Sequence, residues 1–212
     1  MKKIFIARLF LSLMLISVLF VSGCSLKKTA EPSKLRQTGA PINNVSEIAQ
    51  VDISVPRLVD KSSFSIEAPA YWKESPALTP GVSLLMVNAL EKMERPEVQK
   101  INFRSYFSIS YGTLDGKTLD DYVVALKEKL VQMVPNMIFQ DEALKNKVFI
   151  DGREAKVFSA DFTQQGVDFK FLMYVAPGKD NDVWMISLNS LPENFEEYRG
   201  IFNTSALSFR VK

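Results

Sequence analysis

The stretch KVFIDGREAKVF, residues 147–158, gives the clearest indication of how this chain folds. Two apolar runs flank the dipeptide Asp151-Gly152, and both of these residues tolerate the positive φ angles that a tight turn requires. An Asp-Gly pair between two apolar runs is a strong signal for a β-hairpin. The stretch therefore predicts two neighbouring antiparallel strands.

The same pattern continues toward the C-terminus. A second turn signal, Gln165-Gly166, precedes the apolar run VDFKFLMYVAP at residues 167–177. A polar loop at residues 178–182 then leads into DVWMISLN at residues 182–189. Strand-length runs joined by short polar turns are typical of antiparallel sheets, so we expect two further strands here.

Three more strands are expected upstream. The run SFSIEAP (63–69) alternates apolar and polar residues, and VSLLMVNAL (82–90) is apolar on both faces, as in a central strand. The charged run EKMERPEVQK (91–100) is expected to be a loop. After it, INFRSYFSISYG (101–112) predicts a half-buried strand, with Ile101, Phe103, Phe107, Ile109 and Tyr111 on one face and Asn102, Arg104, Ser108 and Ser110 on the other.

Two segments have the spacing of amphipathic helices. In LDDYVVALKEKLVQMV, apolar residues recur at Leu119, Tyr122, Val123, Leu126, Leu130 and Met133. Thr118 and Asp121 form a capping-box pattern at its start, and Pro135 ends it. A second helix begins at Pro192, with Phe195, Tyr198, Ile201, Phe202 and Ser205 on one stripe. Two helices against hairpin-linked strands predict an α+β domain with a largely antiparallel β-sheet.

The N-terminus has the pattern of a lipoprotein signal peptide. Met1–Arg8 is basic, and the 13 residues of Leu9–Val21 are apolar apart from Ser12 and Ser17, too short a run for a membrane span of ~20 residues. The sequence Val21-Ser22-Gly23-Cys24 resembles the lipobox of bacterial lipoproteins. This resemblance implies cleavage between Gly23 and Cys24 and acylation of Cys24. An ordinary secretory signal or an uncleaved anchor, with Cys24 merely buried, remains the alternative.

The predicted organisation has three parts. Residues 1–23 are the signal peptide, residues 24–61 are the lipidated cysteine and a polar tether, and residues 62–212 are one globular domain. Within the tether, VDISVPRLV (51–59) is a weak candidate for an edge strand because it contains Pro56. Ser25, by resemblance to lipoproteins of bacteria with two membranes, favours the outer membrane facing the periplasm. In a single-membrane organism the same anchor would lie on the outer face of the cell membrane.

Composition excludes several classes of site. The chain contains no histidine and one cysteine, which excludes Ser-His-Asp triads, Cys-His pairs, histidine metal sites and intrachain disulfides. Its 26 Lys and Arg against 24 Asp and Glu give a net charge of +2, and no basic block marks a nucleic-acid surface. We therefore expect no nucleic-acid partner.

The candidate chemical sites have stronger structural explanations. Asp180-Asn181-Asp182 offers oxygen ligands to a cation such as Ca²⁺, but the rest of an EF-hand pattern is missing, so a solvated turn is expected. The pairs Asp120-Asp121 and Glu196-Glu197 lie in the early turns of predicted helices, where negative charge is favourable. Ser105 and Ser108 lie near Lys100 and Arg104 in sequence, and a Ser-Lys dyad is the one hydrolase design still open, although no SxxK motif supports it. We expect no catalytic residue, no metal and no cofactor.

Aromatic and methionine residues are the candidates for a ligand site. Trp72, Trp184, Tyr71, Tyr106 and Tyr174 could line a cleft, but aromatic residues in strands more often form the core. The methionines that could form an adaptable binding surface are scattered, so core packing is again expected for Met86, Met93, Met133, Met137, Met173 and Met185.

The order of these elements resembles the PsbP/Mog-like superfamily, which includes DcrB-type proteins and bacterial lipoproteins. The residues that carry the resemblance are FSIEAPAYW, TLDDYVVAL, the IDGREAKVF hairpin and the closing ENFEEYRGIFNTSALSFR. The resemblance implies an α/β/α sandwich and a group of small accessory and binding domains that share no catalytic residues. Metal contacts made through histidine in plant relatives have no counterpart here.

Two hypotheses about function follow. The first is a lipid-anchored, extracytoplasmic, non-enzymatic accessory domain that binds a protein of the cell envelope. The second is a carrier or sensor that encloses an apolar small molecule or lipid. An enzyme that uses only Ser, Lys or carboxylates is a third and weaker alternative.

Overall fold

The computed structural model describes residues 55–77, 81–140 and 147–212, which form two antiparallel sheets and three helices. The large sheet has the order β3-β4-β5-β10-β9-β8-β6, and β7 also pairs with β8. In chain order its strands are β3 (Trp72–Glu74), β4 (Val82–Asn88), β5 (Tyr106–Thr113), β6 (Ile138–Gln140), β7 (Val148–Ile150), β8 (Arg153–Gln164), β9 (Val167–Pro177) and β10 (Asp182–Ser190). Every neighbouring pair is antiparallel.

The small sheet joins the first and last strands of the described chain. β2 (Phe64–Ala68) lies between β1 (Arg57–Asp60) and β11 (Arg210–Val211). Pro56 directly precedes β1, at the start of an edge strand, where a missing N–H costs no ladder hydrogen bond. The predicted boundary between tether and domain at residue 61 stays a prediction, and the rest of the predicted tether and the signal peptide lie outside the described residues.

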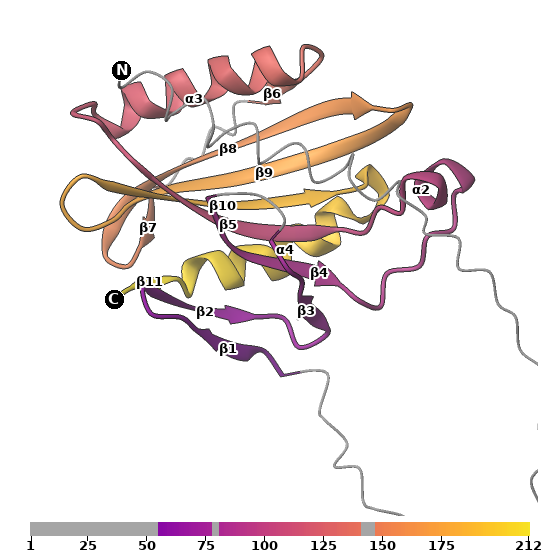
Figure 1. Ribbon diagram of the computed structural model, residues 1–212, viewed down its shortest axis with the longest axis horizontal. Helices are drawn as coiled ribbons and strands as arrows, with labels where there is room; N and C mark the ends of the chain where they lie inside the picture. Colours follow the sequence, from indigo (N-terminus) through magenta and orange to yellow (C-terminus); the bar gives the residue numbers. More distant parts are fainter. Residues whose placement is uncertain (1–54, 78–80, 141–146) are drawn as a thin grey trace, which may run out of the picture.

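Helices cover both faces of the large sheet (Figure 1). α3 (Leu119–Met133) lies over one face, against β8 and β9. α4 (Pro192–Leu207) and the small sheet lie on the other side. This arrangement confirms the α+β class predicted from the sequence, with a largely antiparallel sheet flanked by helices.

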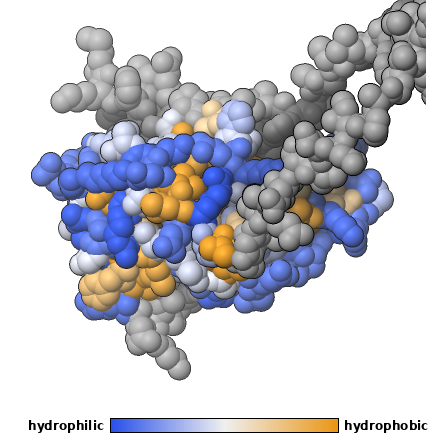
Figure 2. Space-filling model, turned by 90° about the horizontal axis from the view of Figure 1, so that it is seen from below, coloured by the Kyte–Doolittle hydropathy of each residue, from blue (hydrophilic) through white to orange (hydrophobic). Residues whose placement is uncertain are grey.

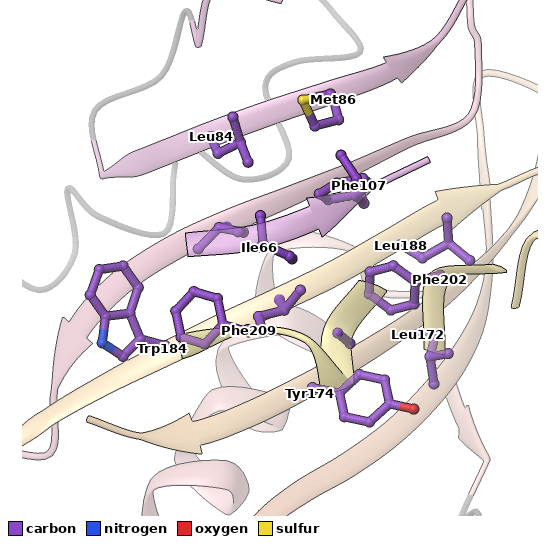
Figure 3. Close-up of a cluster of buried hydrophobic side chains, with 14 of the residues drawn as sticks. Ile66, Leu84, Met86, Phe107, Leu172, Tyr174, Trp184, Leu188, Phe202 and Phe209 are labelled. Carbon is purple, nitrogen blue, oxygen red and sulfur yellow. The ribbon is translucent and has the colours of Figure 1, made fainter. Parts of the chain in front are cut away.

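The core has two halves because the central strands are buried on both faces. Alternate residues of β10 point in opposite directions: Trp184, Ile186 and Leu188 enter the α4-side core, whereas Val183 and Met185 enter the α3-side core. Figure 3 shows the α4-side core, where side chains from β2, β4, β5, β9 and β10 meet Phe202 and Phe209. Aromatic rings contact one another throughout this half, for example Phe64 and Trp184 with centroids 5.4 Å apart. Contacts of this kind fix one arrangement of the rings.

The turns and caps predicted from the sequence are confirmed. Asp151 and Gly152 have φ angles of 51° and 73° and connect β7 to β8, so that Ile150 faces Arg153. At the start of α3, the Asp121 N–H donates to Thr118 Oγ1 at 3.1 Å, and the Thr118 hydroxyl donates to the Asp121 carboxylate at 2.7 Å. These contacts satisfy one of the free N–H groups at the helix start.

The region between β4 and β5 differs from the prediction. The expected loop at residues 91–100 contains a short helix, α2 (Pro96–Ile101), which has proline in its first turn and is ended by Asn102 in the left-handed conformation, with φ of 50°. The predicted strand at residues 101–112 therefore begins only at Tyr106, and Ile101 and Phe103 join the α3-side core. The prediction of a half-buried strand was also wrong, because Ser108 and Ser110 on its expected polar face are buried.

Candidate functional site

The residues of the predicted lipid attachment, Gly23 and Cys24, lie outside the described ranges. No helix within those ranges has both the length and the hydrophobicity needed to cross a membrane. The predicted attachment is therefore not tested by the structure.

A buried polar cluster lies where the β4–β5 connection meets the start of α4. The Glu91 side chain is 8% exposed, and Ser105 and Ser190 are fully buried. The Glu91 carboxylate accepts hydrogen bonds from the Ser105 N–H, from the Ser105 hydroxyl at 2.7 Å and from the Asn194 amide at 2.8 Å. Three donors thus compensate one buried negative charge. The cluster fastens the connection to α4.

The Ser-Lys dyad considered from the sequence does not assemble. The Ser105 hydroxyl donates to Glu91, and the Ser108 hydroxyl lies 2.9 Å from that of Ser187. Arg104 donates to the backbone carbonyl of Ala89 at 2.7 Å. Lys100 is exposed, whereas both serines are buried. These serines therefore contribute to packing and to internal hydrogen bonds.

The pair Asp120-Asp121 lies in the first turn of α3 as expected, whereas the acidic residue in the first turn of α4 is Glu193, and Glu196 and Glu197 lie one turn later. Asp121 caps α3, and Asp120 forms an ion pair with Lys156 at 2.7 Å, which raises the pKa of Lys156. In the β9–β10 turn, the Asp182 carboxylate accepts a hydrogen bond from the Tyr111 hydroxyl at 2.7 Å. Across the described ranges, no three acidic or other metal-ligating side chains gather into a possible metal site.

The aromatic and methionine candidates are mostly core residues. Trp72, Trp184, Tyr106 and Tyr174 are at most 9% exposed. Met86, Met137, Met173 and Met185 are buried, and Met93 and Met133 pack against the α3-side core. Tyr71 is the exception among the five aromatic residues, because it is only partly buried and lines a surface hollow.

This hollow, which we call the β2–α4 groove, has a volume of about 290 Å³. Its apolar lining combines the entry to β1, the turn after β2 and one side of α4: Pro56, Pro69, Ala70, Tyr71 and Ile201. Glu67, Thr204 and Ser205 are the polar lining residues. The groove is therefore mainly apolar with a single carboxylate in its lining.

The α4 wall of the groove follows from helical spacing. Ile201, Thr204 and Ser205 lie at positions i, i+3 and i+4 and share one stripe of the helix. Glu197 lies one turn earlier on the same stripe. Burial raises the pKa of neighbouring Tyr198 to about 12, with further contributions from Glu91, Glu197 and Tyr71, so the Glu197 carboxylate lies near the Tyr198 hydroxyl. A second negative charge thus lies beside the groove.

Exposed apolar residues extend the surface around the groove. Leu58 of β1 is 65% exposed and lies directly opposite Glu67 in the strand register. Val55 and Leu207 are 56% and 45% exposed. Viewed from the side of β1 and β2, the surface shows separate hydrophobic patches bordered by hydrophilic residues (Figure 2).

A second hollow, of about 320 Å³, lies at the far end of the β8–β9 hairpin. Its polar groups are already paired with one another. Lys170 forms an ion pair with Asp161 at 2.9 Å, the Thr163 hydroxyl donates to Asp168 at 2.6 Å, and the Asn136 amide donates to the Thr163 carbonyl at 2.8 Å. This hollow consequently offers a ligand fewer free polar groups than the groove.

Sequence reasoning missed both the buried cluster and the groove. Glu91 begins the charged run at residues 91–100, where a solvated side chain is the normal expectation. One signal for the groove was available: the turn Pro69-Ala70-Tyr71 is apolar, although turns are normally polar. The α4 wall could not be assigned, because helical spacing does not say what the stripe contacts.

Comparison with solved structures places this architecture among known folds. LpqN of Mycobacterium tuberculosis, described as involved in cell envelope biogenesis, has 12% identity over 74% of this chain and 90% of its own, with a TM-score of 0.51. Cyanobacterial PsbP (CyanoP) of Synechocystis has 14% identity over 79% and 99% of the two chains, with a TM-score of 0.48. A Pseudomonas aeruginosa protein of unknown function has 14% identity over 73% and 95%, with a TM-score of 0.49.

At identities this low the LpqN comparison indicates a shared fold alone. The sequence matches no family model. No curated protein matches it either. Membership of the PsbP/Mog-like superfamily therefore stays a prediction, while the α+β architecture is established by the strand pairing itself.

Proposed function

We propose that this protein is a lipid-anchored, extracytoplasmic accessory protein that binds a protein of the cell envelope without catalysing a reaction. The observation that carries the proposal is the lipobox pattern Val21-Ser22-Gly23-Cys24 at the end of a short apolar run. Several acyl chains, at ~0.8 kcal/mol per buried methylene, would hold the protein stably on a membrane. The domain that follows the lipobox in the sequence shares its fold with LpqN, a protein described as involved in cell envelope biogenesis.

The arrangement of the domain favours binding at its surface. Four of the five aromatic residues that were candidates for a ligand cleft are buried in the core, as in the contact of Trp72 with Phe107, whose ring centroids are 5.5 Å apart. The β2–α4 groove, in contrast, is open to solvent and mainly apolar. A carrier that encloses an apolar molecule would need its space in the interior, which these aromatic contacts fill.

Fractionation of cells that produce a Cys24→Ser variant tests the anchor. The unaltered protein is expected in the membrane fraction, with palmitate label incorporated and the signal peptide removed. The variant should lose the label and the processing, because serine cannot accept the thioether linkage. Ser22→Ala, which keeps a small residue in the lipobox, is the matched control and should behave like the unaltered chain.

Two results would contradict the proposal. Normal processing and palmitate labelling of Cys24→Ser would show that Cys24 is not the attachment residue. Repeated chemical cross-linking in intact cells that joined the anchored protein to no envelope protein would remove the binding role.

A further inference from the structure

We propose that the β2–α4 groove is the docking site for a partner protein segment that carries an apolar side chain next to a lysine or arginine. This inference deepens the proposed function, since it names the surface that a cell-envelope partner would contact. The chemistry of the groove sets both parts of the motif. Its lining is apolar at Pro69, Tyr71 and Ile201, and its polar rim carries an acidic residue, Glu67.

The apolar part of the motif follows from the shape of the groove. A hollow of about 290 Å³ is large enough for one or two aliphatic or aromatic side chains, and burial of such a side chain is favourable by ~1.5–3 kcal/mol. Tyr71 and the prolines are stiff, so they lose little conformational freedom when a partner binds. Exposed Leu58 and Val55 beside the groove add apolar area to the same surface.

The basic part of the motif follows from the charges. Within the described residues, no ion pair or hydrogen bond engages the Glu67 carboxylate or the Glu197 carboxylate. Other acidic residues of the domain, in contrast, form ion pairs with lysine or arginine. The groove lining itself contains no lysine or arginine. A cation on the partner would therefore meet two available negative charges. Such complementarity chiefly determines specificity and the rate of association.

The same charges argue against a lipid surface as the occupant. Anionic headgroups attract basic segments and repel carboxylates. Glu67 in the lining and Glu197, one turn before Ile201 on the same stripe of α4, would both face the headgroups if the groove lay on a membrane. A basic protein segment is thus the better fit.

The position of the groove agrees with a partner close to the membrane. Pro56 lines the groove and belongs to the segment 24–61 that is predicted as a tether, so this segment meets the groove. A flexible coil of about 37 residues, the length of the predicted tether, would have a root-mean-square span of roughly 30–36 Å. The groove would then lie within reach of segments that emerge from membrane proteins.

The experiment uses the full chain in nanodiscs of zwitterionic phosphatidylcholine, with isoleucine methyl groups labelled for NMR. The probe is a short synthetic peptide of alternating Ile and Lys between Gly-Ser ends, added at about 1 mM, the concentration at which weak contacts of ~4 kcal/mol become visible. The Ile201 methyl signal, assigned by its loss in Ile201→Val, should shift. Ile109, which is fully buried in the core, is the internal control and should not shift.

Two control peptides separate the parts of the motif. One replaces both lysines with Glu and the other replaces both isoleucines with Ser, and neither should shift Ile201. Glu67→Gln should weaken binding of the basic peptide about 2- to 5-fold, as expected for an exposed ion pair. Glu128→Gln, on exposed α3 across the sheet, is the matched control and should change nothing.

Each other result overturns the proposal. An unmoved Ile201 signal, or an equal shift with the acidic peptide, would show that the groove does not recognise this motif. A shift of the Ile201 signal when the protein alone is diluted would indicate that a second copy of the chain occupies the groove. A shift when the lipid is changed to phosphatidylglycerol would indicate that lipid occupies it. Because the peptide is added in solution, its effect on the Ile201 signal can be measured whether or not Cys24 is acylated. Failure here is therefore distinct from failure of the fractionation test.

Discussion

Gly178 and Gly200 have such different surroundings that the same substitution, glycine to alanine, should change stability in opposite directions. A Cβ atom at Gly178 would lie 2.8 Å from Asp182 Cβ and 2.9 Å from Trp184 Nε1. At Gly200, in the middle of α4, a Cβ would have no neighbour within 4 Å, the helix's own backbone aside. There is no room for a side chain at Gly178. At Gly200 there is room, and glycine in a helix is unfavourable because it loses more conformational entropy than alanine on folding.

We expect Gly178→Ala to destabilise the protein by about 1–3 kcal/mol and Gly200→Ala to stabilise it by about 0.5–1 kcal/mol. Urea unfolding followed by tryptophan fluorescence measures both, because Trp184 lies at the first site. The two variants serve as controls for each other, since the chemical change is the same. Equal shifts in the same direction would contradict the packing described around Gly178.

Glu91 holds the connection between β4 and β5 against α4 through its hydrogen bonds to Ser105 and Asn194. Removal of the carboxylate in Glu91→Ala would leave the buried Ser105 N–H without an acceptor and would free the partly buried Asn194 amide. Each unsatisfied buried donor costs about 1–3 kcal/mol. We therefore expect a loss of about 1–3 kcal/mol in the free energy of unfolding, together with faster hydrogen exchange at the Ser105 amide.

Glu94→Ala is the matched control for this prediction. Glu94 lies in the same connection but is exposed, and surface substitutions usually change stability by less than ~0.5 kcal/mol. A similar effect of both substitutions, or unchanged exchange at Ser105 in Glu91→Ala, would show that the cluster does not fasten the connection.

Elements fixed by local signals could be predicted from the sequence. The Asp151-Gly152 turn, the Thr118 cap and the alternating strand at residues 64–68 each depend on a few adjacent residues, and the structure confirms all three. α2 was missed because a six-residue helix has too few turns to show a periodic pattern. β11 was missed for a related reason, since its two residues form a strand only by pairing with β2.

The candidate site was less predictable than the fold. The groove combines the turn after β2 with residues of α4 that lie more than a hundred positions later in the chain. Local sequence patterns do not predict that two segments so far apart in the chain lie side by side. Even so, four of the five aromatic candidates were correctly expected to be core residues. A large aromatic side chain on a strand that is buried on both faces packs into the core whichever face it is on.

At the scale of the whole molecule, buried tyrosines give stability a dependence on alkaline pH. Burial raises the pKa of Tyr122 and of Tyr198 to about 12, and it also raises the pKa of Tyr106. The folded state then keeps its protons while the unfolded chain loses them above pH ~10. The stabilising contribution is therefore complete below pH ~10 and is lost as the pH rises from ~10 to ~12.

We expect the free energy of unfolding to fall in this range by up to about 1.4 kcal/mol per pH unit for each such tyrosine. Urea unfolding at a series of pH values measures the slope, and tyrosinate absorbance reports ionisation directly. Lysines titrate in the same range, so the difference between the unaltered protein and Tyr122→Phe isolates one tyrosine. An identical slope for the two proteins would contradict the raised pKa of Tyr122.

The small sheet also controls when the domain can be completed during synthesis. β2 pairs on one side with β1 and on the other with Arg210 and Val211, and Phe209 stacks on Phe64 within the same region. A nascent chain that has not yet emerged as far as Val211 lacks one of the two neighbours of β2. Closure of this corner therefore waits for the synthesis of residues 209–211.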